Sequence, residues 1–270
     1  GFTRGIMSSI GLTEGTDFTV DRENGVVSFS SPPSPPAGFT GDDVVICASK
    51  DRSEQRERVF SCGVLQVFGA GGYENQLFLA GSGQCPNQVF WSGAADPTFF
   101  GDLQYAVLGQ DDSAVSSLST FGTYLACHKD ARGGATYLCG VFLSRINGLD
   151  VPQARVEKVI RGTGCIAPYA SQQFGEPVFV TTLGVQALTY RDMTSSEIET
   201  RRGERIARRL LSEPNIEQAV SCLYKDFMLI AVNSHVYVLD RLASEPGRDT
   251  AANDLQYNAF YFDHVPASCL

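Results

Sequence analysis

Short apolar and aromatic segments, separated by turn-forming residues, recur along most of this 270-residue chain. Their centres lie near Phe78, Tyr124, Phe179, Leu229 and Tyr261, roughly 30 to 55 residues apart. Repeats of this length in strand-rich sequence are typical of β-propeller blades, each with three or four strands. A two-sheet sandwich is the rival architecture, because it is also built from short strands and frequent turns. The sequence therefore predicts an all-β fold with a propeller-like body over 58–270.

The strands of this body are expected in successive groups of three. They are predicted at 58–68, 76–80 and 87–91, at 114–118, 123–128 and 136–142, at 156–160, 176–181 and 185–190, and at 219–224, 227–233 and 234–240. Tyr257–Asp263 then reads as the first strand of a further group. We therefore expect an incomplete propeller, still open where the chain stops.

Residues 1–50 are expected to form a separate small β subdomain. Asp17–Asp21 and Val26–Ser30 read as a strand pair, and Asp42–Ser49 reads as another strand. Asn24 and Gly25 between the first two favour a type I′ turn, which needs positive φ at both central residues. The charged segment Lys50–Arg58 is interpreted as the linker to the larger domain.

One segment, Ser195–Leu211, departs from the β pattern and predicts a helix. Ser196 followed by Glu199 is a capping-box pattern, and Pro214 follows the expected end. The segment is rich in arginine, with Arg201, Arg202, Arg205, Arg208 and Arg209. Two interpretations stay open: a solvated face balanced by nearby glutamates, or a docking helix for an acidic partner or DNA.

The most distinctive aromatic stretch, Phe90–Phe100, contains the single tryptophan of the chain. Trp91, Phe99 and Phe100 are the candidate interaction residues in it. Their rings would either plug the gap between neighbouring blades or form an exposed binding patch, for example a platform for a sugar. The residue types allow both interpretations.

Patterns that carry catalysis or bind cofactors are missing from the sequence. It has no G-x-S-x-G, and its histidines, His128, His235 and His264, are too scattered for a zinc site. Gly162–Ala167 fits the G-x-G-x-x-A spelling, but Pro168 follows at once, so no phosphate-binding helix can begin there. We therefore predict a protein that is not an enzyme, with no catalytic, cofactor-binding or metal-binding residues and no small-molecule substrate.

The net charge and the lengths of the apolar runs indicate which kinds of partner to expect. The formal net charge is −9, whereas proteins that clamp nucleic acid are usually basic, so direct sequence-specific binding of nucleic acid is not expected. No apolar run approaches the length of a membrane span. The eight cysteines contain no C-x-x-C pair, and several lie in apolar runs, which favours reduced, buried thiols.

Several stretches resemble a family of tailed-bacteriophage virion proteins, the packaged-DNA stabilisation or tail-hub proteins of the head–tail connector. The matching segments are Gln88–Phe100 with Asp102–Gly109, Gly162–Tyr169, Gly175–Tyr190 and Leu211–Asp240. The N-terminal Gly15–Ser49 is similar to the small β domain of these proteins. The resemblance implies a non-enzymatic, prophage-encoded virion protein. It also implies a homo-oligomeric ring that contacts portal and tail components and helps to retain packaged DNA.

Two further functions remain as alternatives to this head–tail role. One is a carbohydrate- or receptor-binding propeller that uses Trp91, Phe99 and Phe100. The other is a propeller hydrolase, for which the sequence offers no distinctive pair of carboxylates. For the head–tail role, an acidic surface facing DNA would let phosphates slide past, while the arginine-rich segment docks on a neighbouring subunit.

Overall fold

The computed structural model describes residues 12–32, 53–70, 73–94, 96–110, 112–130, 134–146, 149–162, 164–189, 199–246 and 255–265. The chain divides into two compact units, Gly1–Arg52 and Ser53–Leu270. The described strands outweigh the helices by far, which confirms the expected mostly-β fold.

In the first unit, β1 (Phe18–Asp21) and β2 (Val26–Phe29) form an antiparallel hairpin in which Asp21 pairs with Val26. The Asp21 carboxylate accepts hydrogen bonds from the backbone N–H groups of Glu23 and Asn24, at 3.0 and 3.1 Å. Only Gly25 takes a positive φ in this loop, so the expected type I′ turn at Asn24 and Gly25 is wrong. The strand predicted at Asp42–Ser49 lies outside the described residues.

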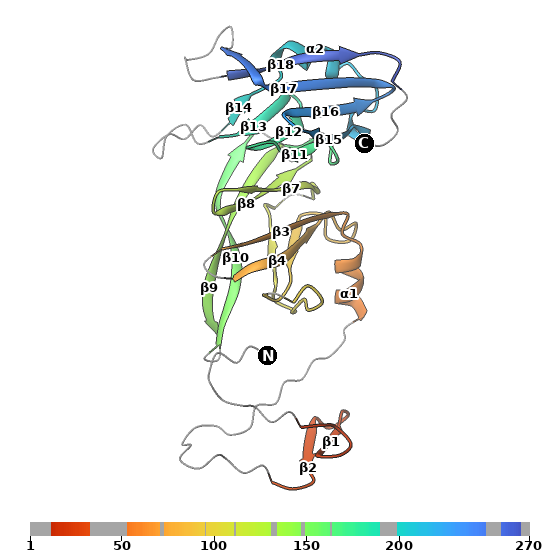
Figure 1. Cartoon of the computed structure of the whole chain (residues 1–270). Helices are drawn as coiled ribbons and strands as arrows, with labels where there is room; N and C mark the ends of the chain where they lie inside the picture. Colours follow the sequence, from red (N-terminus) through yellow and green to blue (C-terminus); the bar gives the residue numbers. More distant parts are fainter. Residues whose placement is uncertain are drawn as a thin grey trace. The chain divides into compact units, whose positions relative to one another are not determined.

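The second unit contains four antiparallel sheets of four strands, and in each sheet the strands pair in sequence order. We number these sheets 1 to 4 (Figure 1). Their strands are, for sheet 1, β3 (Val64–Ala70), β4 (Tyr73–Ala80), β5 (Gln88–Trp91) and β6 (Tyr105–Val107); for sheet 2, β7 (Val115–Phe121), β8 (Tyr124–Lys129), β9 (Ala135–Ile146) and β10 (Leu149–Arg161); for sheet 3, β11 (Ser171–Gln173), β12 (Pro177–Thr181), β13 (Gly184–Leu188) and β14 (Glu199–Arg201); and for sheet 4, β15 (Val220–Tyr224), β16 (Phe227–Val232), β17 (His235–Pro246) and β18 (Leu255–Phe262).

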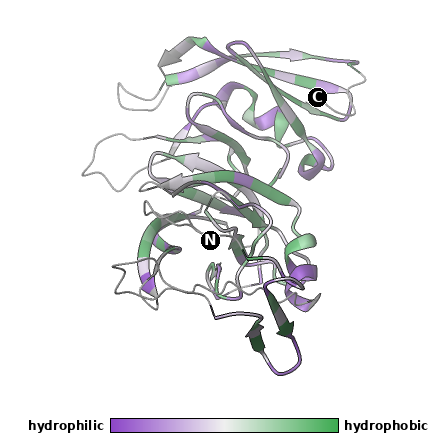
Figure 2. Cartoon of the chain, turned by 60° about the horizontal axis from the view of Figure 1, so that its bottom comes forward, coloured by the Kyte–Doolittle hydropathy of each residue, from purple (hydrophilic) through white to green (hydrophobic). Residues whose placement is uncertain are grey.

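Successive sheets pack face to face in chain order. The first strand of each sheet contacts the first strand of the next, so that β3 meets β7, β7 meets β11 and β11 meets β15. Sheets 2 and 3 are covered on both faces, and every residue of β12 and β13 is buried. Figure 2 shows hydrophobic residues along the strands of this unit. Burial on both faces explains why these strands read as continuous apolar runs rather than as alternating ones.

The fourth strand of each sheet is where the structure corrects the predicted grouping. The segment predicted as a helix from residue 195 contains β14, and α2 occupies only Glu204–Leu210. Pairing of Thr200 with Ala187 places this segment at the edge of sheet 3, so tertiary pairing overrides its helix propensity. The cap predicted at Ser196 lies outside the described residues, and Gly203 occupies the N-cap position.

Two other fourth strands were assigned to the wrong group, and one was missed. Val156–Ile160 lies in β10, which pairs with β9 in sheet 2 rather than starting the next group. Tyr257–Asp263 belongs largely to β18, which pairs with β17 and completes sheet 4 rather than opening a fifth group. The strand β6 was not predicted at all.

The charged segment Lys50–Arg58 is not simply a linker. From Ser53 onward it belongs to helix α1 (Ser53–Phe60), in which Val59 is buried. The Oγ atom of Ser61, just after this helix, lies 2.7 Å from Oγ of Ser82, which follows β4. The helix is therefore attached to sheet 1.

A buried polar cluster lies between sheets 2 and 3, centred on His128. Its Nε2 atom is 2.8 Å from Oγ of Ser119, its Nδ1 atom is 2.8 Å from Oγ1 of Thr136, and its ring centroid is 4.1 Å from that of Phe179. Burial disfavours the charged imidazolium and lowers the pKa of His128 to about 3. His128 is thus a neutral core residue held by two hydroxyl groups.

This burial predicts acid sensitivity of the fold. Between the ordinary pKa of 6.5 and the folded value of about 3, the unfolded chain binds a proton that the folded chain excludes. The stabilisation is complete above pH 6.5 and falls by about 1.4 kcal/mol per pH unit below it, or about 2 kcal/mol at pH 5. Urea unfolding across this range should show that slope, and His128→Gln should reduce it. The exposed His264→Gln is the matched control and should retain it; an unchanged slope in His128→Gln would contradict the assignment.

Candidate interaction surfaces

The outer face of sheet 1, the face turned away from sheet 2, is apolar and partly exposed, although Phe90 on it is buried. At its strand positions paired in register it carries Leu65, Val67, Leu77, Leu79, Gln88, Phe90, Tyr105 and Val107. Leu65 is 66% exposed and Val107 is 50% exposed. None of these eight side chains is charged. The opposite face, with Phe78 and Trp91, is buried against sheet 2.

The outer face of sheet 4, the face turned away from sheet 3, has the same character. Its positions paired in register are Val220, Cys222, Tyr224, Phe227, Leu229, Ala231, Val236, Val238, Asp240, Asn258, Phe260 and Phe262. Val236 and Val238 are covered by their neighbours, whereas Phe260 is 46% and Phe262 is 53% exposed. Asp240 on this face pairs with Phe227 and Asn258. The other positions are apolar or aromatic, and the Lys225 ammonium lies 5.3 Å from the ring centroid of Tyr224.

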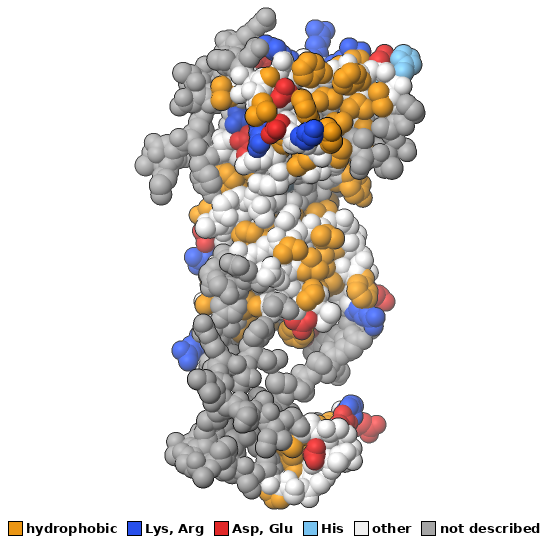
Figure 3. All heavy atoms as spheres, viewed as in Figure 1, with side chains coloured by type: hydrophobic (Ala, Val, Ile, Leu, Met, Phe, Trp, Pro, Cys, Tyr) orange, Lys and Arg blue, Asp and Glu red, His pale blue; other side chains and the backbone are white. Residues whose placement is uncertain are grey.

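Figure 3 shows hydrophobic side chains gathered over sheet 4 and, separately, over sheet 1. Single exposed apolar residues are normal on a protein surface, but contiguous groups usually mark sites of association. Sequence reasoning missed both faces. The signal for them was present: β3 (VLQVFGA) and β18 (LQYNAFYF) carry apolar residues at both odd and even positions, as strands covered on two faces do.

The aromatic residues predicted as an interaction patch do not lie together on the surface. Trp91 is only 1% exposed and packs against Phe78, with ring centroids 6.1 Å apart. The expectation of a shared exposed platform is therefore wrong for Trp91, which fills the core between sheets 1 and 2. Phe99 is exposed and Phe100 is partly buried, both in the loop that follows β5.

The arginines predicted on one helix are distributed over a strand, a connection and a short helix. Arg201 ends β14, while Arg205, Arg208 and Arg209 lie on α2 with exposed side chains. Ile206 and Leu210 form the buried side of this helix, within the core between sheets 3 and 4. The spacing of the two apolar residues turns the intervening arginines outward.

Arg202 differs from the other arginines because it is buried. Its Nε and Nη2 atoms donate to the two carboxylate oxygens of Glu176 at 2.5 and 3.0 Å, and Nη1 donates to the carbonyl of Leu255 at 2.8 Å. The Tyr257 hydroxyl donates to the same carboxylate, and burial followed by this hydrogen bond raises the pKa of Tyr257. Arg202 thus joins sheet 3 to β18, and the expectation that it docks a partner is wrong.

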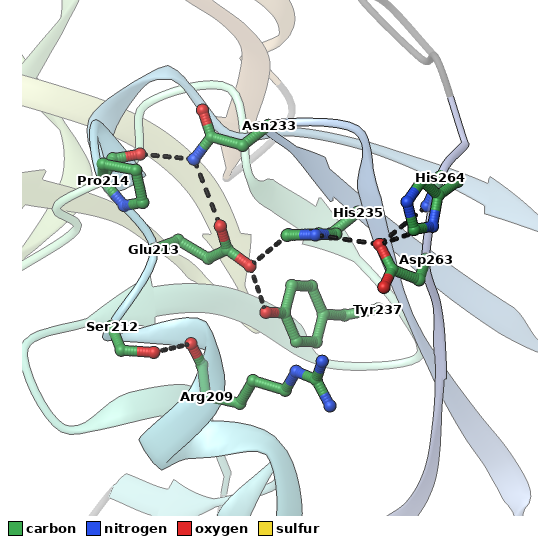
Figure 4. Close-up of polar contacts among 9 residues, drawn as sticks. All are labelled: Arg209, Ser212, Glu213, Pro214, Asn233, His235, Tyr237, Asp263 and His264. Atoms are coloured by element: carbon green, nitrogen blue, oxygen red, sulfur yellow. Dashed lines mark hydrogen bonds and ion pairs between the residues drawn. The ribbon is translucent and has the colours of Figure 1, made fainter.

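A second polar cluster surrounds Glu213, in the connection from α2 to β15 (Figure 4). Its carboxylate accepts hydrogen bonds from the Tyr237 hydroxyl at 2.5 Å and from the Asn233 amide at 3.2 Å, and it lies 2.6 Å from Nδ1 of His235. Burial works to raise the pKa of Glu213, but these hydrogen bonds outweigh it and hold the pKa below its ordinary value. The cluster anchors the connection to β17.

The exposed side chain of Arg209 lies beside this cluster. The Arg209 guanidinium lies 3.4 Å from the ring centroid of Tyr261, whose ring is 5.2 Å from that of Tyr237. On the far side, Nε2 of His235 is 3.1 Å from the Asp263 carboxylate. Arginine, tyrosine and carboxylate groups are thereby fixed on one surface of sheet 4 and α2, an arrangement suited to contacting another macromolecule.

Within the described part of the chain, no group of three or more His, Cys, Asp or Glu side chains is placed to hold a metal ion. The described cysteines, Cys62, Cys85, Cys127, Cys139, Cys165 and Cys222, are free thiols. No helix among the described residues is long and apolar enough to cross a bilayer.

Comparison with known proteins finds no family model and no curated protein that matches this chain.

The structural role of the buried Arg202–Glu176 ion pair can be tested by measuring the stability of variants. Arg202→Met leaves the Glu176 carboxylate largely buried without its cation, and we expect the free energy of unfolding to fall by about 3–5 kcal/mol. Arg208→Met, at an exposed position, should change it by less than about 0.5 kcal/mol. Replacing both partners by apolar residues should recover part of the loss. Urea denaturation measures the free energy of unfolding of all three variants. Equal effects of Arg202→Met and Arg208→Met would contradict a structural role for the Arg202–Glu176 pair.

Proposed function

We propose that this chain is a non-enzymatic structural module of a larger assembly, and that sheets 1 to 4 are consecutive blades of a propeller-like body. The contacts between the first strands of successive sheets support the propeller arrangement, because innermost strands meet in this way around a propeller axis. The observation that carries the assembly role is the pair of uncovered apolar faces at the two ends of the sheet series.

The physical reason is the one that applies to repeat proteins. When repeats bury one another's apolar faces, the terminal repeats normally carry a polar outer face that keeps the molecule soluble. Here both terminal sheets carry apolar outer faces, so each needs a partner surface. An exposed apolar face of this kind is typical of a component of an assembly rather than of an isolated domain.

The assembly that we propose is the head–tail junction of a tailed bacteriophage, where the protein helps to retain packaged DNA. The sequence resemblance supports this assignment, and its matching segments coincide with the framework of the body. Gly162–Tyr169 connects sheet 2 to sheet 3, and its Cys165 carbonyl accepts a hydrogen bond from Ser116 at 2.7 Å. Leu211–Asp240 runs from the end of α2 through β15 and β16 into β17.

The proposed partners are further copies of the chain together with portal and tail components, and the proposed location is the virion. The net charge of −9 fits a protein that lies close to packaged DNA without gripping it. The exposed arginines Arg201, Arg205, Arg208 and Arg209 provide a local basic surface for an acidic neighbour. A sugar-binding platform that includes Trp91 is not supported, because Trp91 is buried.

The experiment is an analysis of particles induced from the source organism. We expect the protein in purified virions by mass spectrometry, and we expect deletion of its gene to give particles that lose DNA or lack tails. Arg205→Glu combined with Arg208→Glu should lower incorporation into particles severalfold, while Arg155→Glu, an exposed arginine on β10, should not. Absence of the protein from particles, with normal DNA retention after deletion, would exclude the proposed role.

A further inference from the structure

Every interface between sheets in the second unit has the same direction. We call the face of a sheet turned toward the next sheet in the chain its forward face, and the other its backward face. Between sheets 1 and 2, Phe78 and Trp91 on the forward face meet Leu118 and Leu125 on the backward face. Each interface therefore joins a forward face to a backward face.

The other two interfaces repeat this relation with different residues. Between sheets 2 and 3, Leu138 meets Phe179 in one core cluster. Between sheets 3 and 4, Val180 and Val185 meet Met228 and Ile230 in another. Four sheets thus form three such interfaces. One backward face, that of sheet 1, and one forward face, that of sheet 4, are left over.

We propose that a second copy of this chain occupies these leftover faces, with the backward face of sheet 1 in one copy packed on the forward face of sheet 4 in the next. This inference rests on the proposed assembly role and specifies the contacts that copies of the chain make. The contact continues the forward-to-backward packing already present inside each copy. It is a head-to-tail, heterologous contact, which joins further copies in the same direction rather than stopping at a symmetric pair.

The chemistry of the two faces fits this pairing. The eight positions named on the backward face of sheet 1 carry no charged side chain, and their polar groups are the amide of Gln88 and the hydroxyl of Tyr105. On the forward face of sheet 4, most positions paired with β16 are apolar or aromatic, and Asp240 is the charged one among them, so most of this face offers an uncharged partner the same apolar character. The forward face carries exposed aromatic rings at Phe260 and Phe262, and the backward face carries smaller aliphatic side chains such as Leu65 and Val67. Side chains of unequal size suit interdigitation between sheets.

A symmetric contact between two copies of one face is less well matched. Two forward faces of sheet 4 would bring their aromatic rings together and would leave the apolar face of sheet 1 exposed in both copies. Two backward faces of sheet 1 would leave the phenylalanines of sheet 4 exposed. Only the head-to-tail contact uses both faces, and its repetition covers every apolar face except those at the ends of a chain of copies.

The test uses one charge substitution on each face, Leu65→Glu and Phe260→Glu, both at exposed positions where folding is expected to survive. Leu183→Glu, in the exposed turn between β12 and β13, is the matched control. Circular dichroism and thermal unfolding establish that all three variants fold. Sedimentation velocity over a wide concentration series then measures association of the purified chains.

We expect the natural chain and Leu183→Glu to associate as concentration rises, and each face variant alone to stay monomeric. A mixture of Leu65→Glu and Phe260→Glu should form a dimer and nothing larger, because each variant retains the face that the other needs. A natural chain that is monomeric throughout would overturn the inference. So would a Leu65→Glu or Phe260→Glu variant that still dimerises alone, since that is a symmetric contact.

These outcomes separate the inference from the function on which it rests. A monomeric chain that is nevertheless found in virions would remove the head-to-tail contact and leave the virion role standing. A chain that associates as expected but is absent from virions would support the head-to-tail contact and exclude the virion role.

Discussion

Face-to-face packing of successive sheets is the interaction on which the rest of the second unit depends. A single four-stranded sheet has two faces and little core of its own, so its stability comes from covering those faces. Three clusters of buried side chains do this between neighbouring sheets, led by Phe78 and Trp91, by Leu138 and Phe179, and by Val180 and Ile230. The outer faces of sheets 1 and 4 have no described sheet packed on them, and exposed apolar side chains remain there.

Polar groups lie between the sheets where they fix how one sheet sits on the next. His128 is held by two hydroxyl groups between sheets 2 and 3, and Arg202 is held by a carboxylate and a carbonyl between sheet 3 and β18. A buried charge that loses its partner destabilises the fold. Such pairs therefore disfavour any other register between the sheets more than they stabilise the native one. The indole N–H of Trp91 is different: it has no hydrogen-bond partner among the described residues.

Most first, second and third strands could be predicted from the sequence, whereas β11 and the fourth strands could not. Segments such as 176–181 and 227–233 carry unbroken apolar runs because both of their faces are covered, and the structure places β12 and β16 there. The fourth strands lie at sheet edges, where packing constrains sequence least. Thr200 pairs with Ala187 although its neighbours favour helix, and β6 has only three residues. Grouping of strands failed for the same reason, since the length of a connection does not reveal which sheet the next strand joins.

The candidate surfaces show why residue type alone misplaces an interaction site. Trp91 and Arg202 stand out in the sequence, yet both belong to the interior, because a large ring and a guanidinium are also the groups best able to join two packed layers. Leu65, Val107, Phe260 and Phe262 look like ordinary strand residues and are exposed. What distinguishes them is their position on the first and last sheets, a property of the fold rather than of any local pattern. In a body built from repeated sheets, whether a strand residue is exposed therefore depends on which sheet it occupies. The sequence reveals this only when every strand has been assigned to its sheet.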